Sequence, residues 1–177
     1  MSSAIFFSVV VGLVGLERLA ELRVAKRNTT WSMQRGGREF GASHYPPMVF
    51  LHTALLAGAL AEVWIARPPF YVGLAIAMGL LLIASQALRW WCIRTLGHQW
   101  NTKIIIIPGM SAVRSGPYRF FTHPNYVAVV VEGFALPLMH TAWITATVFT
   151  ILNAILLRVR IRSENAALRE LSADRQL

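Results

Sequence analysis

Residues 115–157 read SGPYRFFTHPNYVAVVVEGFALPLMHTAWITATVFTILNAILL. A polar, turn-rich segment, 115–126, leads into two apolar runs, 126–138 and 143–157, which PLMHTA joins around Pro137. Each run is short for a membrane crossing, which takes about 20 residues. Together the two runs predict a helical hairpin, whose second arm continues into the polar sequence RVRIRSENAALREL.

The rest of the chain is also apolar. Of its 177 residues 55% are hydrophobic and 14% are charged, whereas soluble domains are roughly 45–50% apolar. Three earlier apolar runs complete the set: 4–20, 48–66 and 70–91. We therefore expect one all-α integral membrane domain, residues 1–177, with about five transmembrane helices of which the last two form the hairpin.

The polar parts of the chain are expected on one side of the membrane. All 17 Lys and Arg residues except Arg67 are assigned to the first connection, to an insert over 92–125 or to a tail over 158–177, with Arg18 and Arg89 at the ends of the apolar runs that adjoin the connection and the insert. Cytoplasmic flanks of membrane helices collect such residues. This predicts an external N-terminus, a cytoplasmic insert and a cytoplasmic C-terminal helix. The net charge of +9 is thereby explained by topology and contact with membrane lipids, and no nucleic-acid partner is predicted.

The insert carries a candidate cofactor site. Gly116 and the next proline predict a turn, and Pro124 both biases His123 away from helical geometry and suits the first turn of the following helix. The N–H groups of a helix start favour an anionic group such as the carboxylate of a small cofactor. Tyr118 and Tyr126 offer ring faces to a nucleobase or a cation. The alternative is an interfacial turn with anchoring aromatic residues.

Acidic residues within apolar runs are further candidates. Glu132 lies on the same helix face as Asn125, seven positions earlier, and a carboxylate at membrane depth indicates a functional site. The alternative is a structural pair with a neighbouring helix. Glu62 lies nearer the outer end of its run and is expected to be structural.

Arg160 and Glu164 lie one turn apart in the tail. They fit either a basic helix end that contacts anionic lipid, or a site in which Arg160 binds an anionic substrate group and Glu164 accepts hydrogen bonds from a ribose or an amine. The remaining histidines have no metal-ligand spacing, Cys92 stands alone, and no phosphate-binding glycine motif occurs. No metal is predicted.

The segment 103–168 resembles the isoprenylcysteine carboxyl methyltransferase family, through SGPYRFFTHPNY and the distal Arg160-x-x-x-Glu164 with Leu168. The resemblance implies an integral membrane enzyme that transfers a methyl group from S-adenosylmethionine to a lipophilic acceptor. The N-terminal segments ERLAELRVAKRN and RGGREFGASHYP, together with HPNY and Glu132, are similar to a bacterial branch associated with type III polyketide synthases. That branch methylates alkylpyrones or alkylresorcinols.

The resemblance also implies roles for individual residues. Arg160 should contact the acceptor, and Lys103 falls where eukaryotic relatives have a cofactor-binding Gln. The cofactor site should be lined by Met110, Ser111, Ala112, Val113, Tyr118, His123, Pro124, Asn125, Tyr126 and Glu164. Asn165 replaces a second acidic residue that is frequent in the family, and this departure favours a small lipophilic acceptor over a prenylated protein.

The acidity of the acceptor decides whether a base is needed. An acidic enol or a carboxylic acid is ionised at neutral pH, so that Arg160 suffices, whereas a phenol with a pKa of about 10 needs a general base. Glu132 or His123 could fill that role. Two other functions stay open: an NADPH-dependent membrane reductase of the steroid reductase type, in which HPNY also precedes a membrane helix, and a non-catalytic membrane subunit.

Overall fold

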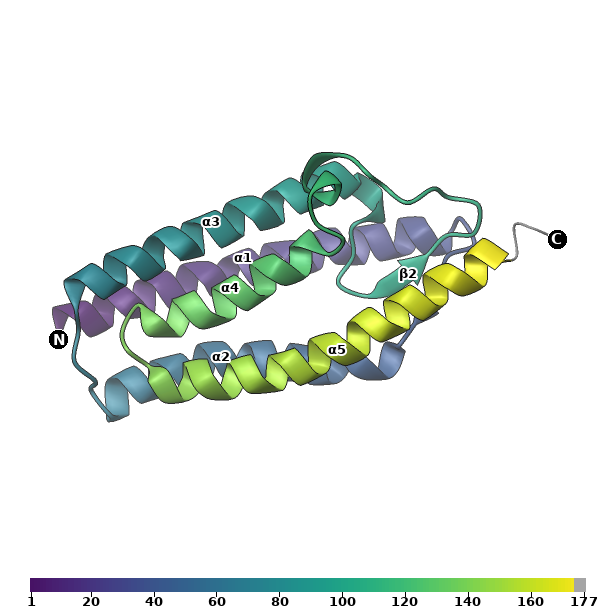
Figure 1. The fold of residues 1–177 in the computed structure, drawn as a ribbon. Coiled ribbons are helices and arrows are strands. Elements are labelled where there is room, and N and C mark those ends of the chain that lie inside the picture. The colour runs from purple at the N-terminus through teal and green to yellow at the C-terminus, as the bar shows by residue number, and fades with distance from the viewer. Residues whose placement is uncertain (174–177) are drawn as a thin grey trace.

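The structure, a computed structural model, describes the backbone of residues 1–173 and side chains as far as residue 169. Its main elements are five helices (Figure 1): α1 Ser2–Met33, α2 Tyr45–Ile65, α3 Val72–Leu96, α4 Pro124–Leu138 and α5 Trp143–Ala173. Three single-turn 3-10 helices lie in the connections: η1 Ala42–His44, η2 Gly97–Gln99 and η3 Gly116–Arg119. Two short strands are β1 Arg38–Phe40 and β2 Ile104–Ile106.

The predicted helical membrane architecture is confirmed, with one difference in the hairpin. Among the described residues, four helices are long and apolar enough to cross a membrane, and they include α1, α2, α3 and α5. The first hairpin arm, α4, has 15 residues and is therefore about 22 Å long, shorter than the hydrocarbon core of about 30 Å. It begins partway along the bundle (Figure 1), because Pro124 fixes its first turn and the polar insert precedes it.

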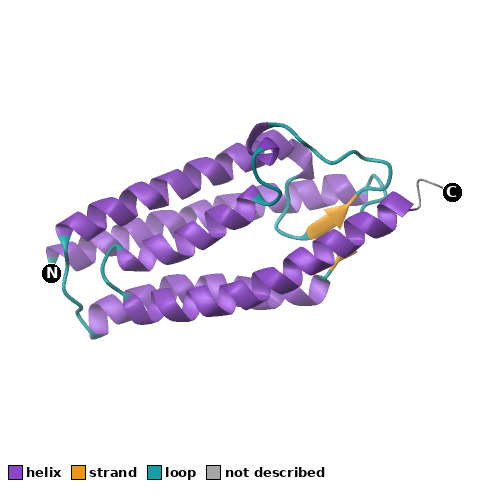
Figure 2. Ribbon diagram, in the orientation of Figure 1, coloured by secondary structure: helices purple, strands orange, loops and turns teal. Residues whose placement is uncertain are grey.

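The two ends of the bundle differ in kind (Figure 2). The N-terminus and the short α2–α3 and α4–α5 connections lie at one end, while the strands, the insert and the end of α5 lie at the other. At the first end, Glu62 accepts hydrogen bonds from the backbone N–H groups of Ile144 and Thr145, at 3.0 and 2.8 Å. Glu62 thus caps the start of α5, the structural role expected of it.

Some predicted boundaries were wrong. The first helix runs to Met33, through residues 29–33 of the connection that was expected to be a loop, and α3 extends to Leu96, five residues into the expected insert. The two prolines before Met48 do not break α2 but occupy its first turn, where a missing N–H costs nothing. Residues 174–177 of the predicted tail lie outside the described residues.

The apolar run KIIIIPG at 103–109, which Pro108 and Gly109 end, is typical of a short strand or extended segment, and its residues Ile104–Ile106 form β2. This strand pairs antiparallel with β1, with Arg38 opposite Ile106 and Phe40 opposite Ile104. Lys103 and Glu39 form an ion pair at 3.0 Å beside the strands. The pairing ties the connection after α1 to the insert.

Helix α4 is the central helix of the bundle. Its buried residues pack with α1, α2 and α3 in a core made of Phe7, Val11, Val14, Ala59, Val63, Leu82, Ala135, Leu136, Met139 and Ala142. On its other side Gly133 faces Phe149 of α5 so closely that a β-carbon at position 133 would overlap the phenyl ring. The small residue therefore sets how near α4 and α5 approach.

We expect Gly133→Ala to lower the stability of the protein. The added methyl forces Phe149 or the α4–α5 spacing to shift, and overpacking of this kind costs about 1–3 kcal/mol. Thermal unfolding in detergent would show a lower Tm. The matched control is Gly12→Ala in α1, where nothing lies within 4 Å of the new methyl. Its Tm should be unchanged or higher, and equal losses at both positions would contradict the packing argument.

Candidate functional site

One cavity of about 1000 Å³ lies at the N-terminal end of α4. Its walls come from α1, α2, α3, the insert, α4 and α5. Most residues expected at the site line it: Lys103, Met110, Ser111, Ala112, Val113, Tyr118, His123, Asn125, Tyr126, Arg160 and Glu164. The fold thus brings together segments that are distant in the sequence.

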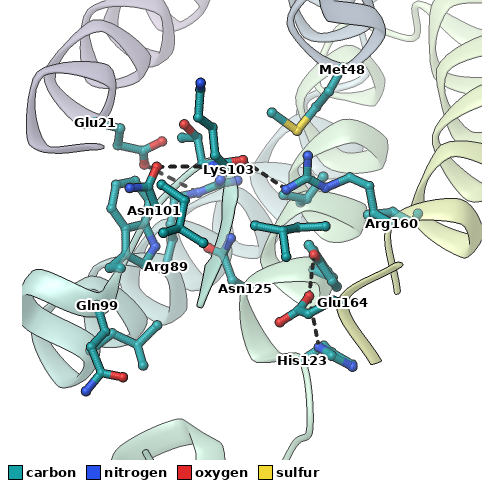
Figure 3. Close-up of a pocket in the computed structure, with 18 of the residues that line it drawn as sticks. Glu21, Met48, Arg89, Gln99, Asn101, Lys103, His123, Asn125, Arg160 and Glu164 are labelled. Atoms are coloured by element: carbon teal, nitrogen blue, oxygen red, sulfur yellow. Dashed lines mark hydrogen bonds and ion pairs between the residues drawn. The ribbon is translucent and has the colours of Figure 1, made fainter. Parts of the chain in front are cut away.

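At one side of the cavity, the motif HPNY meets α5 (Figure 3). The Tyr126 hydroxyl donates a hydrogen bond to Glu164 Oε2 at 2.7 Å, and His123 Nδ1 lies 3.7 Å from the same oxygen. The His123 and Tyr126 rings stack with centroids 5.3 Å apart. No side chain among the described residues caps the start of α4. Pro124 has no N–H, and the Tyr126 and Val127 N–H groups donate to the His123 carbonyl oxygen at 3.1 and 3.4 Å, which leaves the Asn125 N–H for a ligand.

Two more groups at this site have unused polar atoms. Arg160 is 5% exposed and donates from a terminal nitrogen to the Thr102 carbonyl oxygen at 2.9 Å (Figure 3). Its Nε and the Asn125 Oδ1 are buried without a hydrogen-bond partner among the described residues. Buried polar atoms of this kind are normally satisfied, so a ligand in the cavity is the natural partner.

The insert supplies the remaining wall. Residues Met110 to Val113 lie in the extended loop before η3, and Tyr118 lies within η3. Burial, with the neighbouring Cys92 thiol as a smaller cause, raises the pKa of Tyr118 well above its usual range. The hydroxyl therefore stays neutral and acts as a hydrogen-bonding group, not as a base. Pro124 shapes the helix start from a buried position and does not line the cavity.

A cluster of charged residues lies on the side of the cavity away from Glu164 (Figure 3). The sequence did not predict which residues form it. Arg18 of α1 contacts Glu21 Oε2 at 2.6 Å and Glu132 Oε2 at 3.0 Å. Arg89 of α3 contacts Glu132 Oε2 at 2.6 Å and lies 3.5 Å from Glu21 Oε1. In Figure 3, Glu21 and Arg89 lie on the side of the cavity away from Glu164. The only signals in the sequence were the acidic residues one turn apart in α1 and the buried Glu132.

Glu132 holds the cluster together from outside the cavity. It is 2% exposed, and its Oε2 accepts from both guanidinium groups, whereas Arg18, Glu21 and Arg89 line the cavity. An oxygen occupied by two cationic donors is poorly placed to take a proton from a substrate. The geometry favours the structural alternative for Glu132, and its predicted role as a base stays a prediction.

Two polar residues of the cavity wall were also missed. His52 of α2 and Asn153 of α5 both line the cavity. Neither belongs to a recognisable motif, because each lies in an apolar stretch of its helix without other residues at a motif spacing. Only their shared cavity indicates a role.

Similarity to known proteins identifies the family of the chain. The isoprenylcysteine carboxyl methyltransferase (ICMT) family matches residues 75–170, more than half of the chain. YpbQ of Bacillus subtilis (strain 168), described as uncharacterized, is 39% identical over 167 residues, which are 94% of this chain and 98% of that protein. An uncharacterized protein of Haemophilus influenzae (strain ATCC 51907 / DSM 11121 / KW20 / Rd) is 25% identical over 94% of this chain and 97% of its own length. The matched region contains HPNY, Arg160 and Glu164, and the chain therefore belongs to the isoprenylcysteine carboxyl methyltransferase family.

Proposed function

We propose that this protein uses S-adenosylmethionine to methylate an oxygen of a lipophilic small molecule at the membrane. Family membership supports methyl transfer by a membrane protein. The observation that carries the proposal is that one cavity joins the polar, aromatic site at His123, Tyr126 and Glu164 to apolar walls of α1 and α2. A polar cofactor and an apolar acceptor can therefore meet in it. Nothing in the family match supports the reductase alternative.

The residues at the start of α4 fit S-adenosylmethionine. Glu164 accepts one bond from Tyr126, and a carboxylate has about four acceptor positions, which leaves room for ribose hydroxyls. The uncapped start of α4 suits the cofactor carboxylate, and the His123 and Tyr126 ring faces suit adenine or the cationic sulfonium. Asn125 supplies an unpaired amide oxygen. When bound, S-adenosylmethionine supplies an electrophilic methyl group that an acceptor oxygen takes.

The acceptor side of the cavity is apolar. Leu19, Leu22, Val49 and Leu56 line it from α1 and α2, and neighbouring residues of both helices, such as Leu16 and Phe50, are exposed on the outside of the bundle. We propose that an alkyl chain reaches the cavity from the lipid. Arg160, buried and with a free Nε, is assigned to the oxygen that accepts the methyl group.

The proposed acceptor is an alkylpyrone or an alkylresorcinol, the product class of a type III polyketide synthase. Either compound combines a long apolar tail with a small oxygenated ring, as a cavity with one apolar and one polar part requires. An ionised pyrone enol needs only a cation near its oxygen, and Arg160 provides it. For a phenol, His123 is the candidate base, since it lines the cavity while Glu132 does not.

We place the cofactor site on the cytoplasmic side and the N-terminus outside. The strands, the insert and the end of α5 lie at the same end of the bundle, and these segments hold most of the basic residues. Basic residues accumulate on cytoplasmic flanks, and the cofactor is made in the cytoplasm.

The first test is calorimetric binding of S-adenosylhomocysteine to purified protein, with NADP⁺ as a separate ligand. We expect saturable binding of S-adenosylhomocysteine alone, weakened about tenfold or more by His123→Ala or Glu164→Ala, because each variant removes a polar partner. Arg162→Ala is the matched control, since Arg162 is exposed on α5 and does not line the cavity. Binding of NADP⁺ alone, or of neither ligand by folded protein, would refute the methyltransferase.

A second test separates the two roles of Glu132. If Glu132 is structural, Glu132→Gln leaves Arg18 and Arg89 without their shared partner, and breaking a buried pair costs about 3–5 kcal/mol. We therefore expect a clearly lower Tm and equal fractional loss of activity on enol and phenol acceptors. Glu39→Gln, which breaks the half-buried pair with Lys103, is the control and should change stability by about 1 kcal/mol or less. A normal Tm with a loss of about 10²–10⁴ confined to the phenol would instead identify Glu132 as a base.

A further inference from the structure

Two adjacent phenylalanines near the end of the insert are exposed on the outside of the protein. Phe120 is 70% exposed and Phe121 is 49% exposed, and both directly follow the single-turn helix η3. A phenyl ring left in water forgoes the free energy of its burial, and neighbouring exposed apolar residues of this kind mark an interaction surface. The two rings therefore call for an apolar partner outside the protein.

Helix rise gives the level of the two rings along the bundle. Helix α4 runs from Pro124 to the end that holds the N-terminus (Figure 1), so its 15 residues put Pro124 about 22 Å from that end. Helix α3 begins at the same end, and Trp91 lies about 29 Å along it. The start of η3 lies against Trp91, since a β-carbon on Gly116 would be 3.1 Å from Trp91 Nε1. Phe120 and Phe121 connect these two levels. Measured from the N-terminal end, a hydrocarbon core about 30 Å thick reaches just past them.

The outer surface next to the rings belongs to membrane helices. Val127 and Val130 of α4 and Trp91 of α3 are exposed on it, and α3 is long and apolar enough to cross a membrane. Trp residues are enriched where a membrane meets water. Phe120 and Phe121 therefore continue a lipid-facing surface from the start of α4 to the level of Trp91.

The insert is basic around the rings and contains no acid. The Arg119 guanidinium lies 5.8 Å from the Phe120 ring centroid, and Arg94, Arg114 and Arg119 are all exposed. None of the three arginines forms an ion pair within the described part of the chain, and residues 92–125 include no Asp or Glu. Unpaired cations beside apolar rings are suited to anionic lipid headgroups at the edge of the hydrocarbon.

The backbone of this turn tolerates an apolar environment. Irregular backbone is excluded from lipid chiefly because its polar groups lack partners. Here the N–H groups of Phe120 and Phe121 both donate to the Pro117 carbonyl oxygen, at 3.1 Å. Pro117 itself is buried, so the turn is fixed to the protein from the inside. The two rings can enter the membrane without leaving their own N–H groups unpaired.

We propose that residues 119–122, the interface turn, insert into the lipid surface on the side of the membrane that holds the insert. Phe120 and Phe121 enter the edge of the hydrocarbon, and the arginines contact anionic headgroups. The insert thus returns to the membrane before α4 begins. Both phenylalanines also line the cavity, so lipid rather than water borders the cavity at this turn. The inference concerns the membrane and does not depend on which reaction the protein catalyses.

Spin labels test this placement in vesicles of phosphatidylcholine and phosphatidylglycerol. The one cysteine of the chain, Cys92, is buried, and a Cys92→Ala background leaves a single label in Phe120→Cys or Phe121→Cys. Accessibility is measured to oxygen, which concentrates in lipid, and to a water-soluble nickel chelate. We expect the oxygen-to-nickel ratio at both positions to approach that of Val130→Cys on α4. It should exceed severalfold the ratio of Thr30→Cys, which is exposed on α1 about 42 Å from the start of that helix.

Other readings of the same experiment would overturn the interface turn. A ratio at Phe120→Cys and Phe121→Cys equal to that of Thr30→Cys would place the turn in water. Low accessibility to both reagents, or dipolar broadening between labels, would show that another protein chain covers the rings. If the labelled protein is unfolded, loss of the oxygen preference at Val130→Cys reveals it, and fluorescence quenching of Phe120→Trp by brominated lipid then replaces the label.

The headgroup contact has its own test. Vesicles of phosphatidylcholine alone should lower the oxygen-to-nickel ratio at Phe121→Cys, because the arginines lose their anionic partners. Arg119→Gln should reduce the difference between the two kinds of vesicle. Arg169→Gln is the matched control, since Arg169 is exposed on α5 outside the insert, and it should keep the full difference. The same ratio in both kinds of vesicle would refute the contact with anionic headgroups.

Discussion

A carboxylate buried among membrane helices is kept only where cations neutralise it, and Glu132 meets that condition through Arg18 and Arg89. The three residues come from α4, α1 and α3, so the ion pairs hold three helices at one depth. This matters most for α4, whose 15 residues are too few to span a bilayer alone. The close contact of Gly133 with Phe149 fixes the remaining neighbour, α5.

The depth of α4 positions the site. Because the helix starts partway through the bundle, its first residues, His123 to Tyr126, lie inside the protein rather than at its rim, and Tyr126 can reach Glu164 on α5. The pairing of β1 with β2 brings the insert over the same space and places Thr102 against Arg160. A cavity formed in this way is polar at the start of α4, apolar along α1 and α2, and polar again near the charged cluster. That succession of environments fits the cofactor and the amphipathic acceptor that we propose.

Much of this could be predicted from local patterns. The apolar runs predicted the helices and the isoleucine run predicted β2, while HPNY, Arg160 and Glu164 were predicted to share one site and do line the same cavity. The end of α1 could not be predicted in the same way, since the residues after Asn28 look like a polar loop. Tertiary contacts hold this part of α1 in place: the Asn28 amide donates to the carbonyl oxygens of Gly97 and Trp100, at 3.1 and 2.7 Å, and the Asn101 amide donates to the Thr29 hydroxyl oxygen at 2.8 Å.

Hydrophobic periodicity and turn chemistry act over a few residues, and for this reason the sequence by itself determined the membrane helices, the hairpin and the motif at the start of α4. The partners of buried polar groups can come from any part of the chain, and only the tertiary structure decided which groups pair. Arg18 meets Glu132 although 114 positions separate them, and His52 comes to share a cavity with Asn153 only because α2 packs against α5. The sequence around an isolated polar residue in an apolar helix does not indicate which groups that residue contacts. The packing of the helices sets its environment. The free energy of burial then determines which polar pairs, and which unpaired polar groups, the fold retains.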